Sequence, residues 1–152
     1  MSLRHRKNIR LKKEIYSNRN QIFSITICTK DRRPIFAKEL WAQTIIETFQ
    51  TEPFRKNTES YAYCLMPDHL HLLVSRKNGN LIDFIRRWKS YTANLLNKSG
   101  WDGPCWQRGF YDHALRKDED IRITAEYIVH NPVREHIAKH WREYPYSWHK
   151  WM

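Results

Sequence analysis

Two extended segments joined by only two residues constrain the fold of this chain most strongly. Residues 60–66 (SYAYCLM) and 69–76 (HLHLLVSR) are predicted strands, and Pro67-Asp68 makes a tight break between them. Strands with so short a connection pair naturally in the antiparallel sense. The sequence therefore predicts a β-hairpin in the middle of the chain.

The segments around this hairpin alternate between strand and helix patterns. Residues 21–29 alternate apolar and polar side chains and are rich in β-branched residues, which is typical of a strand. In residues 38–51 apolar side chains recur at helical spacing, and Glu52-Pro53 ends the predicted helix. The remaining predicted elements are a helix over 81–97, a strand over 109–116, a helix over 118–131 that ends where Pro132 pushes Asn131 out of helical geometry, and a short helix with an aromatic tail over 141–151.

This order of elements predicts an α+β fold of the ferredoxin-like, split βαβ type. We expect an antiparallel sheet with the helices on one face. The predicted organisation is a basic N-terminal arm over residues 1–20 and a single domain over residues 21–152.

Charge and aromatic content indicate the class of partner. The formal net charge is +11, and the chain has seven Trp, eight Tyr and six Phe, which excludes disorder throughout. A strong positive charge favours a polyanion such as nucleic acid. Aromatic rings beside cations favour single strands, because unstacked bases lie on such rings.

Other classes of protein are disfavoured. Only four Gly are present, without a GxGxxG or GxxxxGK[ST] pattern, which argues against dinucleotide and P-loop sites. Cys28, Cys64 and Cys105 are isolated, so neither a zinc ribbon nor a disulfide framework is indicated. Reduced thiols, no secretory signal and no run as long as a membrane span predict a cytoplasmic, nucleoid-associated protein.

The basic residues fall into groups that are candidates for DNA contact. A solvated tail is an equal alternative for the arm. The candidates are Arg4, Arg6, Lys7, Arg10, Lys12 and Lys13 in the arm, Arg86, Arg87 and Lys89 in the helix over 81–97, and Arg108 in the following loop.

His69 and His71 form the first chemical motif. In a strand, residues i and i+2 point to the same face, so the two imidazoles stand side by side and could grip a metal ion. A chance HxH is the alternative, because the chain has eight His. Two ligands also leave the site incomplete, so a third must come from elsewhere.

Tyr127 and Asn131 form the second motif. Their i and i+4 spacing puts both on one face of the predicted helix over 118–131. Tyr is a possible nucleophile, and an amide oxygen is a possible ligand for a hard metal. Half-buried packing of Tyr and a helix stop at Asn-Pro are the alternatives.

The two motifs together suggest phosphodiester chemistry. A metal held by two His and one amide oxygen keeps open positions, which phosphate oxygens can fill. A Tyr one helical turn from the third ligand would then lie beside the phosphate. Mg²⁺ or Mn²⁺ suits such a site. Tyr91, on the basic helix, is a competing nucleophile, although its i+4 neighbour Leu95 cannot bind metal.

Several blocks of the sequence resemble one known family. MPDHLHLLV is similar to the histidine–hydrophobe–histidine (HUH) strand of single-tyrosine, IS200-like transposases. WQRGFYDHALR, YIVHNP and the closing YPYSW resemble the branch called REP-associated tyrosine transposases. The resemblance runs from about the first strand to the C-terminus, outside the basic arm.

The resemblance implies a ferredoxin-like catalytic domain that cuts and rejoins single-stranded DNA near hairpins. It implies that His69, His71 and Asn131 bind a divalent metal and that Tyr127 is the nucleophile. His113 also matches the branch, and a structural role is expected for it.

We therefore expect a metal-dependent endonuclease and strand transferase that forms a 5′-phosphotyrosine intermediate, with Mg²⁺ or Mn²⁺ as cofactor. The expected partner is single-stranded or hairpin DNA, not a membrane, and the chain is expected to act as a monomer or homodimer. The alternatives are a domesticated module that binds hairpin DNA or RNA without cutting it, and a metallonuclease that uses water and forms no adduct.

Overall fold

The computed structural model describes residues 13–152. Most of the predicted basic arm, with Arg4, Arg6, Lys7, Arg10 and Lys12, lies outside these residues. The remainder of the predicted arm belongs to the folded domain. It contains the short helix α1 (Lys13–Tyr16), whose Tyr16 is 1% exposed and stacks on Phe23 with ring centroids 5.4 Å apart. The hydroxyl of Tyr16 also donates a 2.6 Å hydrogen bond to Asp112.

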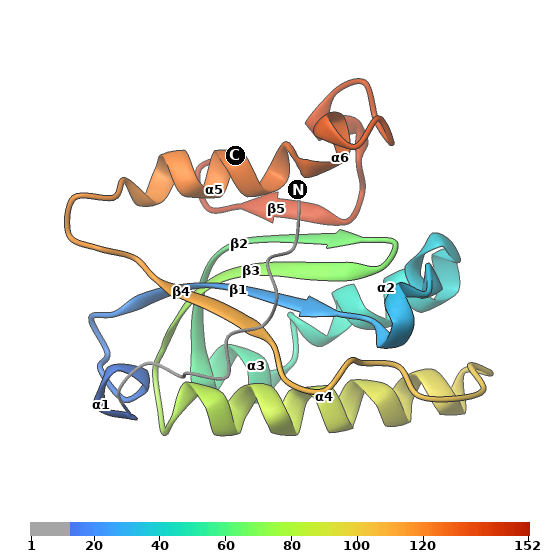
Figure 1. The fold of residues 1–152 in the computed structure, drawn as a ribbon, viewed down its shortest axis with the longest axis horizontal. Coiled ribbons are helices and arrows are strands. Elements are labelled where there is room, and N and C mark those ends of the chain that lie inside the picture. Colours follow the sequence, from blue (N-terminus) through green and yellow to red (C-terminus); the bar gives the residue numbers. More distant parts are fainter. Residues whose placement is uncertain (1–12) are drawn as a thin grey trace.

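Five antiparallel strands form the sheet, in the order β4-β1-β3-β2-β5 (Figure 1). The strands are β1 (Ile22–Cys28), β2 (Thr58–Met66), β3 (His69–Arg76), β4 (Tyr111–Ala114) and β5 (Ser147–His149). The predicted hairpin is confirmed, since β2 pairs with β3 across Pro67-Asp68. The order of the first four strands is that of the split βαβ arrangement, so the predicted α+β, ferredoxin-like class is confirmed.

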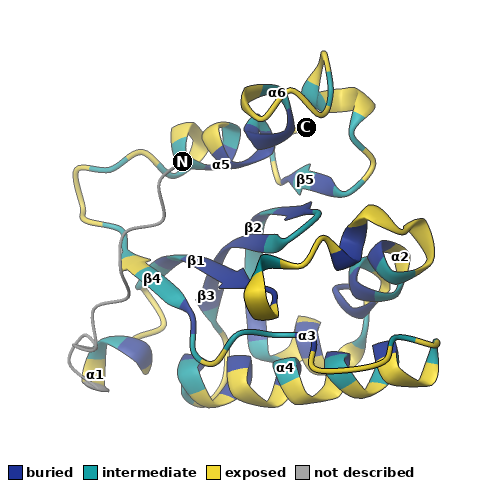
Figure 2. Ribbon diagram, turned by 45° about the vertical axis from the view of Figure 1, so that its right-hand side comes forward, coloured by how far each residue is buried: buried dark blue, intermediate teal, exposed yellow. Residues whose placement is uncertain are grey.

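Three helices cover one face of the sheet. They are α2 (Glu39–Thr48), α3 (Glu52–Asn57) and α4 (Leu81–Lys98). Alternate strand residues such as Ile25, Leu72 and Val74 pack with Phe84 and Trp88 in the main core. The outward side of α4 is exposed in Figure 2.

A further helix lies on the other face of the sheet, beyond the predicted one-sided arrangement. Ala125 and Ile128 of α5 (Ile121–Val129) pack in a second apolar cluster with Cys64 and Leu73. These strand residues alternate with the main-core positions, so they point to the opposite face. Figure 1 shows α5 and α4 on opposite sides of the sheet. His69 and His71 point to the same face as α5, because they are four and two residues before Leu73 in the same strand.

Helix boundaries differ from the predicted ones at two prolines. Pro53 lies in the first turn of α3, where no backbone N–H is needed, so it begins a helix as well as following one. Pro132 has the same position in α6 (Asn131–Arg134). Asn131 therefore starts a helical turn, and the interruption falls one residue earlier, at His130, the C-cap of α5.

The beginning of α5 and the last strand also differ from expectation. Asp120 is the N-cap of α5 and accepts a hydrogen bond from the Ile123 backbone N–H, so the helix begins three residues later than predicted. Strand β5 lies within the predicted aromatic tail, where Ser147–His149 pairs with β2.

Candidate active site

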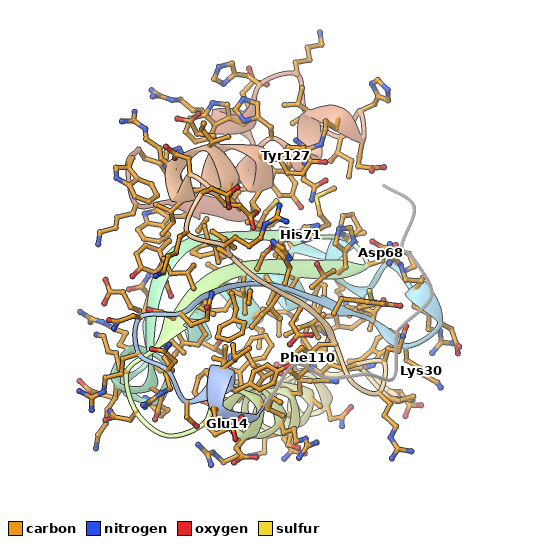
Figure 3. The ribbon with its side chains drawn as sticks, turned by 60° about the vertical axis from the view of Figure 1, so that its left-hand side comes forward. Glu14, Lys30, Asp68, His71, Phe110 and Tyr127 are labelled. Atoms are coloured by element: carbon orange, nitrogen blue, oxygen red, sulfur yellow. The ribbon has the colours of Figure 1, made fainter. Side chains whose placement is uncertain are left out.

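The two histidines of the predicted metal site are fixed by the central strand of the sheet. His71 lies opposite Thr26 of β1 and Cys64 of β2, and it is 5% exposed. His69 is half-buried at the beginning of β3. Their Nε2 atoms are 3.1 Å apart (Figure 3 shows the position of His71). The predicted side-by-side arrangement is what the structure contains.

The outer nitrogens of both rings have partners. Nδ1 of His69 lies 2.7 Å from an Asp68 carboxylate oxygen, and Nδ1 of His71 lies 3.0 Å from the Thr26 hydroxyl. With Nδ1 as the donor in both bonds, both Nε2 atoms carry lone pairs and face each other. Two facing lone pairs suit a shared cation, and such outer partners orient metal-binding imidazoles. The donor set therefore fits a metal ion.

The electrostatics keep the buried imidazole neutral, as a ligand must be. Burial, followed by the electrostatic influence of His69 and Arg134, lowers the pKa of His71 to about 3. The hydrogen bond from His69, more than the nearby Arg32 guanidinium, lowers the pKa of Asp68. The outer carboxylate thus stays charged where it holds His69.

Asn131 and His69 line one cavity of about 320 Å³, together with Met66, Asp68 and Glu135. Asn131 is 4% exposed, and its amide makes no hydrogen bond to another group within residues 13–152. The same residues contain no cluster of three or more His, Cys, Asp or Glu that could hold a metal. The amide of Asn131 is thus placed in the same cavity as His69 and is a candidate third ligand for the histidine pair.

Tyr127 lies on α5 above the sheet face that carries His71 (Figure 3). Its side chain is 54% exposed and does not line the cavity of His69 and Asn131. The guanidinium of Arg134 lies 3.7 Å from the centroid of its ring. The charge of Arg134 also contributes to lowering the pKa of His71, so this cation acts on both the nucleophile candidate and a histidine of the pair.

Sequence reasoning missed the residues that support this site. Asp68 and Thr26 hold the imidazoles, and Arg32 pairs with Asp68 at 3.0 Å. Only two of the missed residues leave a sequence signal. Asp68 directly precedes the HLH motif, and Arg134 follows Tyr127 by seven residues, which is two helical turns.

Comparison with known families identifies the chain. A family model described as "Transposase IS200 like" matches residues 17–131, well over half of the chain, and the match includes His69, His71, Tyr127 and Asn131. The chain belongs to the IS200-like transposase family. The predicted family is therefore confirmed.

Two similar proteins carry the name of the predicted branch. A REP-associated tyrosine transposase of Escherichia coli (strain K12) is 28% identical over 109 residues, which cover 72% of this chain and 62% of the relative. A putative REP-associated tyrosine transposase of Haemophilus influenzae is 28% identical over 141 residues, which cover 83% of this chain and 78% of the relative. This chain thus spans less than two thirds of the length of the E. coli relative.

Solved structures share the fold. A REP-associated tyrosine transposase bound to a REP hairpin has a TM-score of 0.65 and 22% identity, over 97% of this chain and 82% of that chain. A putative transposase from Deinococcus radiodurans has a TM-score of 0.51 and 21% identity, over 70% and 87%.

Tyr91, the competing nucleophile candidate, lies on the other side of the sheet from the histidines. It is 46% exposed on α4, and α4 packs on the opposite face of the sheet. The structure therefore puts His69 and His71 in contact, puts His69 and Asn131 in one cavity, places Tyr127 on the same side of the sheet, and separates Tyr91 from all four.

The cations that are candidates for DNA contact differ in exposure and in hydrogen bonding. Arg86 and Arg87 are exposed on α4, on the side away from the histidines, and Arg108 is exposed in the loop before β4. Lys89 points inward, and its ammonium donates 2.7 Å hydrogen bonds to the carbonyls of Gln107 and Gly109. Lys89 therefore ties the loop to α4. The side chain of Lys13 lies outside the described part of the chain.

His113 has the structural contact expected for it. Its Nε2 lies 2.8 Å from Glu119, which also accepts a hydrogen bond from the Arg116 backbone N–H. These bonds close the connection between β4 and α5.

None of the helices within residues 13–152 is both long and apolar enough to span a membrane.

Proposed function

We propose that this transposase is a metal-dependent endonuclease and strand transferase that cuts single-stranded DNA beside a hairpin. One observation carries the proposal. Two imidazole nitrogens 3.1 Å apart share a face of the sheet with the helix that bears Tyr127, and His69 shares a cavity with the amide of Asn131. A DNA-binding module needs no such combination of ligands and a nucleophile.

His69, His71 and Asn131 are the residues that would hold the metal. Two nitrogen ligands and one amide oxygen leave coordination positions for phosphate oxygens, which suits Mg²⁺ or Mn²⁺. Such an ion polarises a phosphodiester and neutralises the charge that develops on it.

Tyr127 supplies the covalent step. Its phenolic oxygen attacks the phosphorus, and the bond from phosphorus to the 3′ oxygen breaks. The phenolic proton is lost, and the departing oxygen takes up a proton and becomes a 3′-hydroxyl, while the 5′ phosphate stays on Tyr127. The guanidinium of Arg134, 3.7 Å from the centroid of the ring, would hold the ring in position for this attack. Because one ester replaces another, the reverse reaction rejoins the strand.

Hairpin DNA is the proposed partner for two reasons. The similar transposase structure contains a REP hairpin. The net charge of +11 of this chain also favours a polyanion.

A covalent adduct is the decisive observation. We would incubate the wild type, Tyr127→Phe and Tyr91→Phe with labelled hairpin DNA and Mn²⁺, and analyse them on a denaturing gel. The wild type and Tyr91→Phe are expected to give cleavage and a shifted protein band that protease removes. Tyr127→Phe keeps the ring but lacks the attacking oxygen, so it is expected to bind DNA and give neither. EDTA is expected to abolish both products.

Other outcomes would favour the alternatives. Cleavage without an adduct would indicate a water nucleophile. Binding without cleavage in the wild type would indicate a non-cleaving module, and an adduct that persists in Tyr127→Phe would refute the assignment of the nucleophile.

A further inference from the structure

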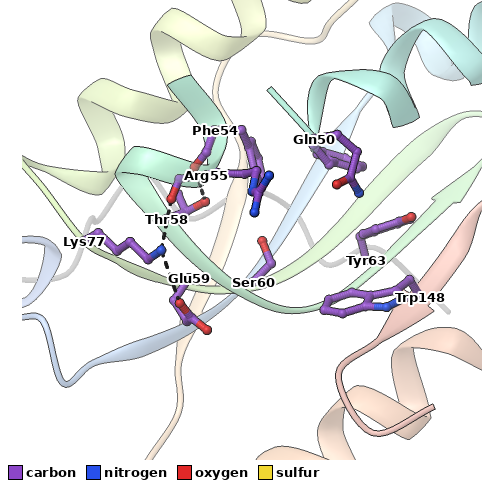
Figure 4. Close-up of a pocket in the computed structure, with 10 residues that line it drawn as sticks. Gln50, Phe54, Arg55, Thr58, Glu59, Ser60, Tyr63, Lys77 and Trp148 are labelled. Carbon is purple, nitrogen blue, oxygen red and sulfur yellow. Dashed lines mark hydrogen bonds and ion pairs between the residues drawn. The ribbon is translucent and has the colours of Figure 1, made fainter. Parts of the chain in front are cut away.

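A second cavity, of about 370 Å³, lies at the edge of the sheet formed by β2 and β5 (Figure 4). Phe49 and Phe54 contribute to it from the α2–α3 side, and Tyr63 and Trp148 contribute from the strands. It has no lining residue in common with the cavity of His69 and Asn131. Nothing in the proposed cleavage step uses it.

A β-bulge shapes this cavity. The register of β2 against β3 shifts between Ser60, opposite Val74, and Ala62, opposite Leu73. In a regular strand, residues three apart point to opposite faces. The extra residue of the bulge brings Ser60 and Tyr63 to the same face, so a hydroxyl lies near an aromatic ring.

One wall of the cavity is aromatic. Tyr63 and Trp148 are directly opposite each other in β2 and β5, and their rings stack with centroids 5.9 Å apart and an interplanar angle of 26°. The ring of Phe49 packs against that of Tyr63, with centroids 4.7 Å apart. Both strand rings are only half-buried, which leaves ring surface open to a ligand.

The rim of the cavity is positively charged. Arg55 is exposed, its guanidinium has no partner within residues 13–152, and Figure 4 shows it over the cavity. Lys77 is fixed beside it, because its ammonium donates to the Arg55 carbonyl at 3.1 Å and pairs with Glu59 at 3.5 Å. Glu59 also pairs with Lys150 at 3.5 Å. Two lysines therefore pair with one carboxylate, Arg55 adds a third cation, and the rim has a net positive charge.

We propose that this cavity binds one unpaired nucleobase of the DNA, stacked against Tyr63 and Trp148, with an adjacent phosphate on Arg55. The volume is near the lower limit for ligand pockets, which fits one base and excludes a base pair. Stacking accepts any base, and the cationic rim selects a ligand with a phosphate. Gln50 and Ser60 offer hydrogen bonds to the edge of the base.

The cavity and the histidines lie on opposite faces of the sheet. Tyr63 at the cavity and Met66 near His69 are three residues apart in β2, which corresponds to about 10 Å, and they point to opposite faces. The bound base therefore belongs not to the nucleotide at the cut but to another nucleotide of a single-stranded segment beside the hairpin. This inference rests on the proposed function for its ligand, which is DNA, but it does not require cleavage.

Binding measurements without metal test the inference separately from cleavage. We would use the Tyr127→Phe protein with EDTA and a labelled hairpin that has single-stranded tails on both sides. Each tail nucleotide in turn is replaced by an abasic residue, and affinity is measured by fluorescence anisotropy. One tail position is expected to lose about 5- to 150-fold in affinity when its base is removed. In the Trp148→Leu variant that position is expected to lose its effect.

Arg55→Gln, with Lys56→Gln as a matched control, tests the phosphate contact. Both residues are exposed cations of α3, but Lys56 does not line the cavity. Arg55→Gln is expected to weaken binding of intact DNA about fivefold, and Lys56→Gln to have a markedly smaller effect.

The inference would be overturned if no abasic position changed the affinity for DNA, or if Arg55→Gln and Lys56→Gln bound DNA equally well. A complete absence of DNA binding would overturn it as well. Because Arg55 is exposed, its variant keeps the test valid even where Trp148→Leu fails to fold. A single sensitive position in a protein whose wild type forms no adduct would support this cavity and refute only the cleavage proposal.

Discussion

Asp68 is predicted to control how tightly the histidine pair holds a divalent ion, and Asp68→Asn tests this. One carboxylate oxygen accepts from Nδ1 of His69 at 2.7 Å, and the other accepts from Nε of Arg32 at 3.0 Å. An Asn amide has one acceptor oxygen and one donor nitrogen. The variant can therefore serve one of these donors and must turn its NH₂ group toward the other.

The expected loss follows from this lost bond. Replacing an outer partner of a metal-binding His costs about 10- to 100-fold in metal affinity, which is about 1.4–2.7 kcal/mol. Folding is expected to be affected less. Asp68 and Arg32 are about a third exposed, and ion pairs in such positions contribute about 0–1 kcal/mol.

Calorimetric titration with Mn²⁺ at pH 7.5 measures the change in affinity. The control is Asp102→Asn, which removes the same charge from an exposed loop residue. A folded Asp68→Asn protein that binds Mn²⁺ as tightly as the wild type would refute the orienting role of Asp68. An equal loss in Asp102→Asn would show a general effect of charge.

Three further predictions concern other parts of the molecule. His71 has a pKa of about 3 in the folded state and 6.5 in the unfolded state, so the unfolded state binds more protons and the free energy of unfolding falls as the pH decreases below 6.5. Denaturant unfolding of the metal-free protein should show a loss of about 2 kcal/mol between pH 7.5 and 5, and this loss should be absent in His71→Gln. Arg134→Gln should slow adduct formation about 2- to 30-fold in single-turnover gels, the value of a cation–π contact of about 0.5–2 kcal/mol. Deleting residues 1–13 should flatten the salt dependence of DNA binding, and an unchanged slope would identify the arm as a solvated tail.

Local patterns predicted the centre of the fold better than its margins. The hairpin was predictable because a two-residue connection leaves little choice of pairing, and β3 has the predicted bounds His69–Arg76. Strand β5 was not predictable, because it has three residues and owes its conformation to pairing with Ala62–Cys64 of β2. A proline such as Pro53 is compatible with the end of one helix and with the first turn of another. Only the packing of Phe54 in the core favours the first turn of a helix here.

The candidate site shows the same division. Side chains alternate between the two faces of a strand, so the spacing of His69 and His71 alone predicts that they share a face. The partner Thr26 is 45 residues from His71 and meets it only through the pairing of β1 with β3. The contacts of Lys89 could not be predicted for the same reason: the sequence shows a cation on a helix, whereas the fold supplies two carbonyl acceptors.

The proposed chemistry explains why ligands and nucleophile differ so much in burial. His71 and Asn131 are 5% and 4% exposed, whereas Tyr127 is 54% exposed. A metal site needs ligands that do not move, and neighbours on the central strand and on a buried helix turn supply that rigidity. The phosphate of a DNA strand cannot be enclosed, because the polymer continues on both sides, so its nucleophile must be reachable from solvent. An exposed tyrosine would lose orientation without support, and the Arg134 guanidinium 3.7 Å above its ring supplies that support from the turn that begins with Asn131. The third ligand, the cation and the nucleophile therefore belong to one short stretch of chain, so the position of one depends on the others.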